Sequence, residues 1–196
     1  MGIAAGIGAA GVRNELVHPG QVRNSFLRWT LLLAPGVMLL GALSGAIAGE
    51  TATNPWFAAL AKPALSPSLA AFGLAWGILL PLTGLAAAVV AAARGAYWRK
   101  TALVVFAVQL VLALAWRPLF FAAHQITQGL AVLVALDLAV LATIVLFNRV
   151  RPAAAAMMLP YLAWLLFLTL LTWQFMTANP HLDGQPVSGA VTRVTL

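Results

Sequence analysis

The chain has 196 residues, of which 63% are hydrophobic and only 8% are charged. Together with a mean hydropathy of +0.97, this composition excludes a soluble globular domain, because such a domain needs far more polar surface. Lysine and arginine number 11 against 4 acidic residues, a net charge of +7. The cations lie in short segments between apolar runs, so they are expected to meet lipid headgroups and not nucleic acid. The sequence has no cysteine, which excludes disulfides and thiolate chemistry.

In chain order, residues 1–28 are rich in Gly and Ala and then polar, and they predict a basic N-terminal arm that is not a cleaved signal peptide. Apolar runs long enough to cross a bilayer, which takes about 20 residues, follow it. In lipid these runs must be helical, because every backbone amide needs an internal partner. The sequence therefore predicts an all-α integral membrane protein, a five-helix bundle over residues 29–178 with a polar tail at 179–196. The expected spans are residues 29–49, 68–93, 101–121, 126–147 and 153–177.

The distribution of cations predicts an orientation. If the N-terminus is cytoplasmic, eight cations lie on the inner side and three on the outer side, which agrees with the positive-inside rule. The C-terminus is then expected on the opposite side. The inner cations are Arg13, Arg23, Arg28, Arg94, Arg99, Lys100, Arg149 and Arg151, and the outer ones are Lys62, Arg117 and Arg193.

Glycines spaced four apart predict close helix packing in two spans. Gly41, Gly45 and Gly49 follow this spacing in the first span, and Gly73 and Gly77 follow it in the second. Small residues at this spacing let helix backbones approach closely in lipid. The alternative is coincidence, because the spacing is common in a Gly-rich apolar sequence.

The stretch from residue 54 to 76, NPWFAALAKPALSPSLAAFGLAW, contains a loop with three prolines that leads into the second span. The loop carries Trp56 and Phe57, and Lys62 is its only cation. An apolar, Trp-bearing loop beside a membrane is expected to lie in the interface or to fold back as a lid over the bundle.

Aromatic residues recur on three of the spans at helical spacing. Trp76 and Trp164 lie too deep in their spans to be interfacial anchors. Such faces predict a cavity for a large planar or polyene ligand, and the alternative is plain helix packing. The faces consist of Phe72 and Trp76; of Gln109, Trp116 and Phe120; and of Tyr161 and Trp164.

Asp137 is the one acidic residue inside a predicted span. An ionised carboxylate at the bilayer centre costs about 2.5–3.5 kcal/mol, so such residues are functional candidates. The two interpretations are a structural hydrogen bond between helices and a contact with a ligand or partner. His18, His124 and His181 lack the paired spacing of metal sites on helices, so no metal site is predicted. No catalytic pattern is present either, and an enzymatic activity is not expected.

Several ordered motifs resemble the TspO and translocator protein family, also known as tryptophan-rich sensory proteins or peripheral benzodiazepine receptors. The first covers Trp56-Phe57, Lys62-Pro63, Phe72 and Trp76. The second is Gln109-Leu110 followed by WRPLFF at residues 116–121, and the third is PYLAW at residues 160–164. The resemblance extends over residues 54–179, most of the chain.

The resemblance implies a five-helix bundle, often dimeric, with a pocket beneath the first loop that takes porphyrins or heme and, in some members, other apolar molecules. It implies no obligatory cofactor, and bound porphyrin, carotenoid or lipid are the expected ligands. Leu65, Ala70, Ser68, Leu74, Leu80, Ala113 and Thr172 replace aromatic, proline or polar residues of the family pattern, which favours a more aliphatic ligand. The expected ligand-binding residues are Trp56, Phe57, Lys62, Pro63, Phe72, Trp76, Gln109, Trp116, Phe120, Tyr161 and Trp164.

Three functions remain open from the sequence. The first is a bacterial membrane receptor or regulator that binds a tetrapyrrole or another apolar ligand such as a carotenoid or lipid. The second is a structural accessory subunit of a larger membrane complex, for example a photosynthetic pigment–protein assembly. The third is porphyrin photo-oxidation with Trp76 and Trp164 as redox-active residues. The expected partners are membrane lipid and either a second copy of the chain or other subunits, with no nucleic acid.

Overall fold

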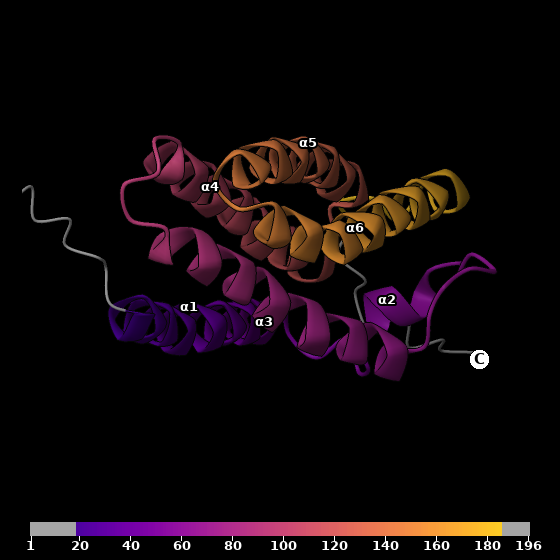
Figure 1. The fold of residues 1–196 in the computed structure, drawn as a ribbon. Coiled ribbons are helices and arrows are strands. Elements are labelled where there is room, and N and C mark those ends of the chain that lie inside the picture. The colour runs from indigo at the N-terminus through magenta and orange to yellow at the C-terminus, as the bar shows by residue number, and fades with distance from the viewer. Residues whose placement is uncertain (1–18, 186–196) are drawn as a thin grey trace, which may run out of the picture.

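The computed structural model describes residues 19–185, with side chains from residue 24 onward (Figure 1). This part of the chain contains helices and no strand. The helices are α1 (Pro19–Ala48), α2 (Pro55–Ala59), α3 (Leu69–Ala92), α4 (Arg99–Arg117), the π-helix η1 (Pro118–Ala122), α5 (Ile126–Val150) and α6 (Pro152–Ala178).

Five of the described helices are long and apolar enough to cross a membrane: α1, α3, α4 with η1, α5 and α6. They lie at the positions of the five predicted spans, so the predicted all-α membrane fold is confirmed to this extent. The remaining α-helix, α2, is one short turn inside the loop between α1 and α3.

The first helix begins earlier than the sequence predicts. α1 starts at Pro19, ten residues before Trp29, so the end of the predicted arm is helical. Proline suits the first turn of a helix, and no further proline follows before Pro35. Hydropathy marks where lipid begins, and a helix can continue beyond that boundary. Residues 1–18 of the predicted arm lie outside the described residues.

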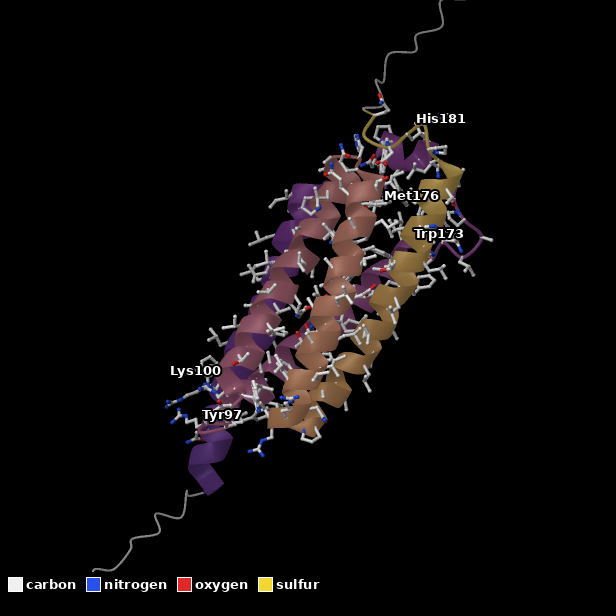
Figure 2. All side chains as sticks on the ribbon, turned by 90° about the horizontal axis from the view of Figure 1, so that it is seen from above. Tyr97, Lys100, Trp173, Met176 and His181 are labelled. Carbon is white, nitrogen blue, oxygen red and sulfur yellow. The ribbon has the colours of Figure 1, made fainter. Side chains whose placement is uncertain are left out.

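The spanning helices form a closed ring. α1 packs on α3, α3 on α6, α6 on α5 and α5 on α4, and α4 with η1 returns to α1. Short connections at residues 93–98 and at Arg151 make neighbours in sequence run antiparallel. Two bundle ends result: the loop end, with residues 49–68, 118–125 and 179–185, and the basic end, with residues 93–98 and 148–151. Figure 2 shows Tyr97 and Lys100 at one of these ends and His181 at the other.

Pro118 explains the change from α4 to η1. Proline has no N–H, so the carbonyl of Leu114 loses its partner in the α-helical ladder. Ser44 on α1 compensates, because its hydroxyl donates to the Leu114 oxygen at 2.7 Å. The backbone then widens into a π-helical turn, in which the Ala123 N–H bonds to the Pro118 oxygen at 2.9 Å. This turn aims Phe120 and Phe121 into the bundle, where both are buried.

The glycine spacing predicts close packing only in part. An added Cβ at Gly41 would meet Leu80 of α3, and one at Gly45 would meet Arg117, so these two glycines do lie at contacts. Gly49 instead follows the end of α1 with φ +77°. A Cβ added at Gly73 or Gly77 would have nothing within 4 Å among the described residues, so their role in close helix packing stays a prediction. Gly84 also lies at a close helix contact, because an added Cβ would be 2.7 Å from the α1 backbone.

Candidate functional site

The candidate site lies at the loop end, beneath the closing loop (residues 49–68). Asn54 starts α2: its Oδ1 accepts from the Phe57 N–H at 3.0 Å, which is an ordinary helix N-cap. Its Nδ2 donates to the Phe121 oxygen at 2.9 Å and so ties the loop to η1. One side chain therefore both begins α2 and fixes it over the bundle.

Trp56 is fully buried in α2 and holds the loop closed. Its Nε1 donates to the Leu182 oxygen at 2.9 Å. Its ring stacks on His124 at 4.7 Å between centroids and meets the edge of Phe120 at 5.5 Å. Because its one polar group is already bonded, the structure places Trp56 as a clamp and not on the wall of the cavity described below.

The tail turn (residues 179–185) closes the loop from the other side. Asn179 Oδ1 accepts from the Ala61 N–H at 2.7 Å, and its Nδ2 donates to the Ala61 oxygen at 3.0 Å. The carboxylate of Asp183 accepts from the Ile126 N–H at 2.6 Å and so caps α5. Asn179 and Asp183 both lie in the segment that the sequence predicts as a polar tail, and no sequence motif indicates their role. Of the residues that close the loop, only Asn54 could have been recognised from its neighbours in sequence, because it directly precedes Pro55 in the pattern of a helix start.

Beneath the loop lies the aromatic cluster, which consists of Phe72, Trp76, Trp116 and Trp164. Phe72 contacts all three indoles, with ring centroids at 6.2 Å from Trp76, 6.3 Å from Trp116 and 5.9 Å from Trp164. Trp76 and Trp116 lie nearly parallel at 6.4 Å. Three predicted faces, from α3, α4 and α6, therefore do converge, as the helical spacing indicates.

Five side chains of this region have buried polar atoms without a hydrogen-bond partner among the described residues. The atoms are Nε1 of Trp76, Trp116 and Trp164, both amide atoms of Gln109, and Oγ of Ser66. Buried polar atoms are almost always paired, so each exception calls for an explanation. Unpaired indole N–H groups can donate to acceptor atoms of a bound molecule.

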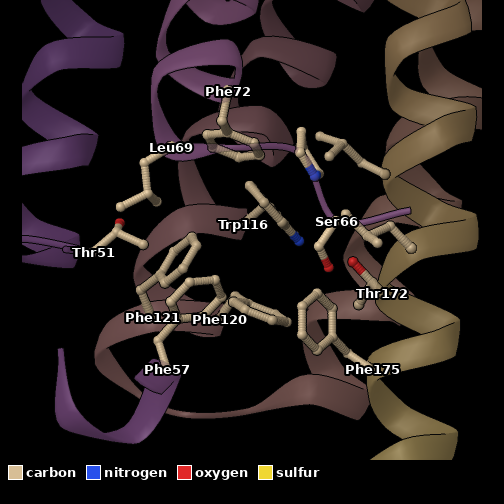
Figure 3. A pocket seen from close by; sticks show the side chains of 13 residues that line it. Thr51, Phe57, Ser66, Leu69, Phe72, Trp116, Phe120, Phe121, Thr172 and Phe175 are labelled. Carbon is tan, nitrogen blue, oxygen red and sulfur yellow. The ribbon is translucent and has the colours of Figure 1, made fainter. Parts of the chain in front are cut away.

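The cavity next to the cluster is small, and of the cluster only Phe72 and Trp116 line it. Its volume is about 50 Å³, and it lies between the closing loop, η1 and α6, as Figure 3 shows. Small-molecule sites measure about 300–1,000 Å³, so this cavity has no room for a tetrapyrrole. The protein's own rings fill the interior. The lining residues are Thr51, Phe57, Ser66, Pro67, Leu69, Phe72, Trp116, Phe120, Phe121, Leu168, Leu171, Thr172 and Phe175.

Other predicted site residues lie around this centre. Tyr161 is buried with its ring edge 6.2 Å from Trp76. Lys62 is exposed, and its Nζ lies 5.2 Å over the Phe57 ring, next to the partly exposed Pro63. Neither Lys62 nor Pro63 lines the cavity. Of the departures from the family pattern, Thr172 lines the cavity, whereas Leu65 and Leu74 are largely exposed and cannot change it.

Asp137 joins two helices away from the cavity. Its Oδ2 accepts from the Thr169 hydroxyl at 2.7 Å, which links α5 to α6. Its Oδ1 is buried without a partner among the described residues. The geometry therefore provides the interhelical hydrogen bond of the structural interpretation. Within residues 19–185, no group of three or more His, Asp or Glu side chains is placed to hold a metal ion.

Comparison with known proteins identifies the family. The profile of the TspO/MBR family matches residues 32–177, which is most of the chain. The chain belongs to the TspO/MBR family. This confirms the resemblance drawn from the loop, WRPLFF and PYLAW motifs, and it agrees with five membrane-spanning helices.

Three relatives show how far the similarity extends. The chain is 31% identical over 155 residues to the tryptophan-rich protein TspO of Chlorobaculum tepidum, covering 77% of this chain and 96% of that protein. It is 37% identical over 120 residues to the human translocator protein, covering 60% and 71%. It is 33% identical over 140 residues to the protein CrtK of Rhodobacter capsulatus, covering 71% and 88%.

Proposed function

We propose that this TspO/MBR family member is a membrane receptor or regulator that binds a tetrapyrrole or another extended apolar molecule in its aromatic cluster. The observation that carries the proposal is the set of unpaired indole N–H groups of Trp76, Trp116 and Trp164 around Phe72. Ring faces supply stacking area, and the N–H groups supply donors for a few acceptor atoms. Relatives named translocator protein and tryptophan-rich sensory protein are consistent with this role.

Binding on this proposal requires the closing loop to open. The cavity of about 50 Å³ lies well below the roughly 300–1,000 Å³ of small-molecule sites. The loop is held shut by Asn54, Trp56 and Asn179. Release of these contacts would let the loop move away and the rings of Phe72 and Trp116 separate. The ligand would then enter from the loop end.

The test is a titration of the purified protein with protoporphyrin, followed by Trp fluorescence. We expect saturable quenching in the parent protein. Trp76→Phe and Trp164→Phe keep a ring but remove one N–H each. Each should weaken binding by about 2- to 10-fold, the value of one hydrogen bond of about 0.5–1.5 kcal/mol.

Trp173→Phe is the matched control, because Trp173 is half exposed on α6 and lies outside the aromatic cluster. It should lower the total fluorescence and leave the affinity unchanged. Equal affinities in the parent protein and in both cluster variants would contradict the assignment of the site.

The small cavity favours a second candidate function. A bundle whose interior is filled by its own side chains can serve as an accessory subunit of a larger membrane complex. Purification from the native membrane in a mild detergent separates the two functions. Co-migration with a large pigmented complex supports the accessory role, and a free monomer or dimer that quenches saturably with protoporphyrin supports the receptor.

A further inference from the structure

A second and larger hollow lies between α1 and α3, which we call the α1–α3 groove. Its volume is about 480 Å³, within the range of small-molecule sites. Gly73 and Gly77 of α3 border it, and among the described residues no atom lies within 4 Å of a Cβ added at either, so the groove is open along this side of α3. It meets the aromatic cluster at Phe72 and Trp76 but is otherwise separate.

Arg117 supplies the cation of this groove. It lies on the last turn of α4, and its Nη1 would be 2.6 Å from a Cβ added at Gly45, so the guanidinium rests on α1. Its Nε is buried and has no hydrogen-bond partner among the described residues. A charged side chain within a membrane span is costly unless it is paired, so this guanidinium calls for an anion.

The arrangement of the groove matches an amphiphile in length and polarity. It runs from Met38 on α1 to Glu50 in the closing loop, and the ten residues from Met38 to the end of α1 at Ala48 alone rise about 15 Å. Arg117 lies opposite Gly45, close to the loop end, where headgroups are expected. The deeper walls, at Met38 and Leu80, are apolar and suit an acyl chain.

We propose that the α1–α3 groove binds an anionic phospholipid, with its phosphate paired to Arg117 and one acyl chain lying between α1 and α3. Guanidinium and phosphate form two parallel charge-assisted hydrogen bonds, a geometry that lysine does not reproduce. Glu50 borders the same end of the groove and opposes an anion there. The proposal requires no tetrapyrrole, and the groove shares only Phe72 and Trp76 with the aromatic cluster.

The experiment uses the full chain in nanodiscs of phosphatidylcholine that contain increasing fractions of a brominated lipid. Bromine on the acyl chains quenches Trp76, which borders the groove. One series uses brominated phosphatidylglycerol and the other brominated phosphatidylcholine. We expect half-maximal quenching at an about tenfold lower fraction of the anionic lipid, which is the preference that one charge-assisted pair supports.

Variants separate the charge from the shape of the groove. Arg117→Gln should abolish the preference, so that both lipids quench at the same fraction. Arg117→Lys should keep a smaller preference, and Glu50→Gln should raise it. Gly77→Leu should fill the groove and weaken quenching by both lipids. Lys100→Gln removes an exposed cation at the basic end and should change nothing.

Two outcomes would overturn the proposal. The first is equal quenching by the two lipids in the parent protein, or a preference that survives Arg117→Gln. The second is an absence of saturable quenching by either lipid, which would mean that a second copy or another occupant covers the groove. Protoporphyrin quenching and thermal unfolding of Arg117→Gln, both expected to match the parent, show that a lost preference is not a lost fold.

Discussion

At the loop end, the contacts that hold the closing loop shut, which we call the closure, differ from the aromatic cluster beneath them in how their polar groups are paired. In the closure, Asn54, Trp56 and Asn179 each bond to a backbone atom of a distant segment. In the aromatic cluster directly beneath, three indole N–H groups have no partner among the described residues. The closure therefore stabilises this conformation of the chain, whereas the polar groups of the interior contribute nothing to it. This difference separates residues that hold the fold from residues that are available to a ligand.

The largest effect should come from breaking the closure at Asn179. Asn179→Ala removes the two side-chain bonds to Ala61 and one of the two bonds to the Phe175 oxygen, which keeps its bond from the Asn179 backbone N–H. At about 0.5–1.5 kcal/mol for each of the lost hydrogen bonds, the free energy of local loop opening should fall by about 1.5–4.5 kcal/mol. Hydrogen exchange of residues 54–61 measures this opening.

Asn148→Ala is the matched control, because Asn148 is exposed at the basic end. It should leave exchange in the loop unchanged. If Asn179→Ala left the loop as protected as in the parent protein, the tail turn would not be what holds the loop.

A smaller loss is expected at Trp56. Trp56→Phe removes the donor to the Leu182 oxygen but keeps ring contacts with His124 and Phe120. The expected cost is about 1–3 kcal/mol in the free energy of unfolding, measured in detergent. Trp173→Phe, on the exposed side of α6, should cost less. Equal losses in the two variants would show that the Leu182 bond contributes nothing.

In the interior, removing a polar group should leave the stability unchanged or raise it. Gln109 is 1% exposed, and neither of its amide atoms has a hydrogen-bond partner within residues 19–185. Gln109→Met keeps the shape and removes the unpaired groups, so the protein should be unchanged or more stable by about 1 kcal/mol. Thermal unfolding measures it, with the exposed Gln128→Met as control. A clear loss of stability would show that Gln109 has a partner after all, such as a retained water.

The smallest effect is expected at Lys62. Its ammonium lies over Phe57 at an exposed site, where such contacts contribute about 0.5–1 kcal/mol. Lys62→Gln should lower the thermal stability of the loop by no more than this. If the same unfolding experiment showed a loss as large as that of Trp56→Phe, Lys62 would belong to the residues that hold the loop shut.

The sequence predicts the spans and the convergence of Phe72, Trp76, Trp116 and Trp164 well, because helical spacing fixes which side chains share a face. It does not predict the clamp of Trp56 or the role of Asn179. Their partners, Leu182 and Ala61, lie 126 and 118 residues away, and no local pattern reports such contacts. The cavity volume also escapes prediction, because it depends on how the rings of three helices pack. The orientation of the chain in the membrane and its dimerisation stay predictions.

Because the bundle has five spanning helices, the described chain begins at one end of the bundle and finishes, with the tail turn, at the other. Because α6 ends beside α2, anything attached soon after Gln185 stands at the proposed entrance, whereas α1 begins at the far end of the bundle. A fluorescent reporter attached directly after Gln185 would therefore risk opening or blocking this entrance. The same reporter attached directly before Pro19 would lie at the far end of the bundle, so a pair of proteins labelled at these two positions is itself a probe of access.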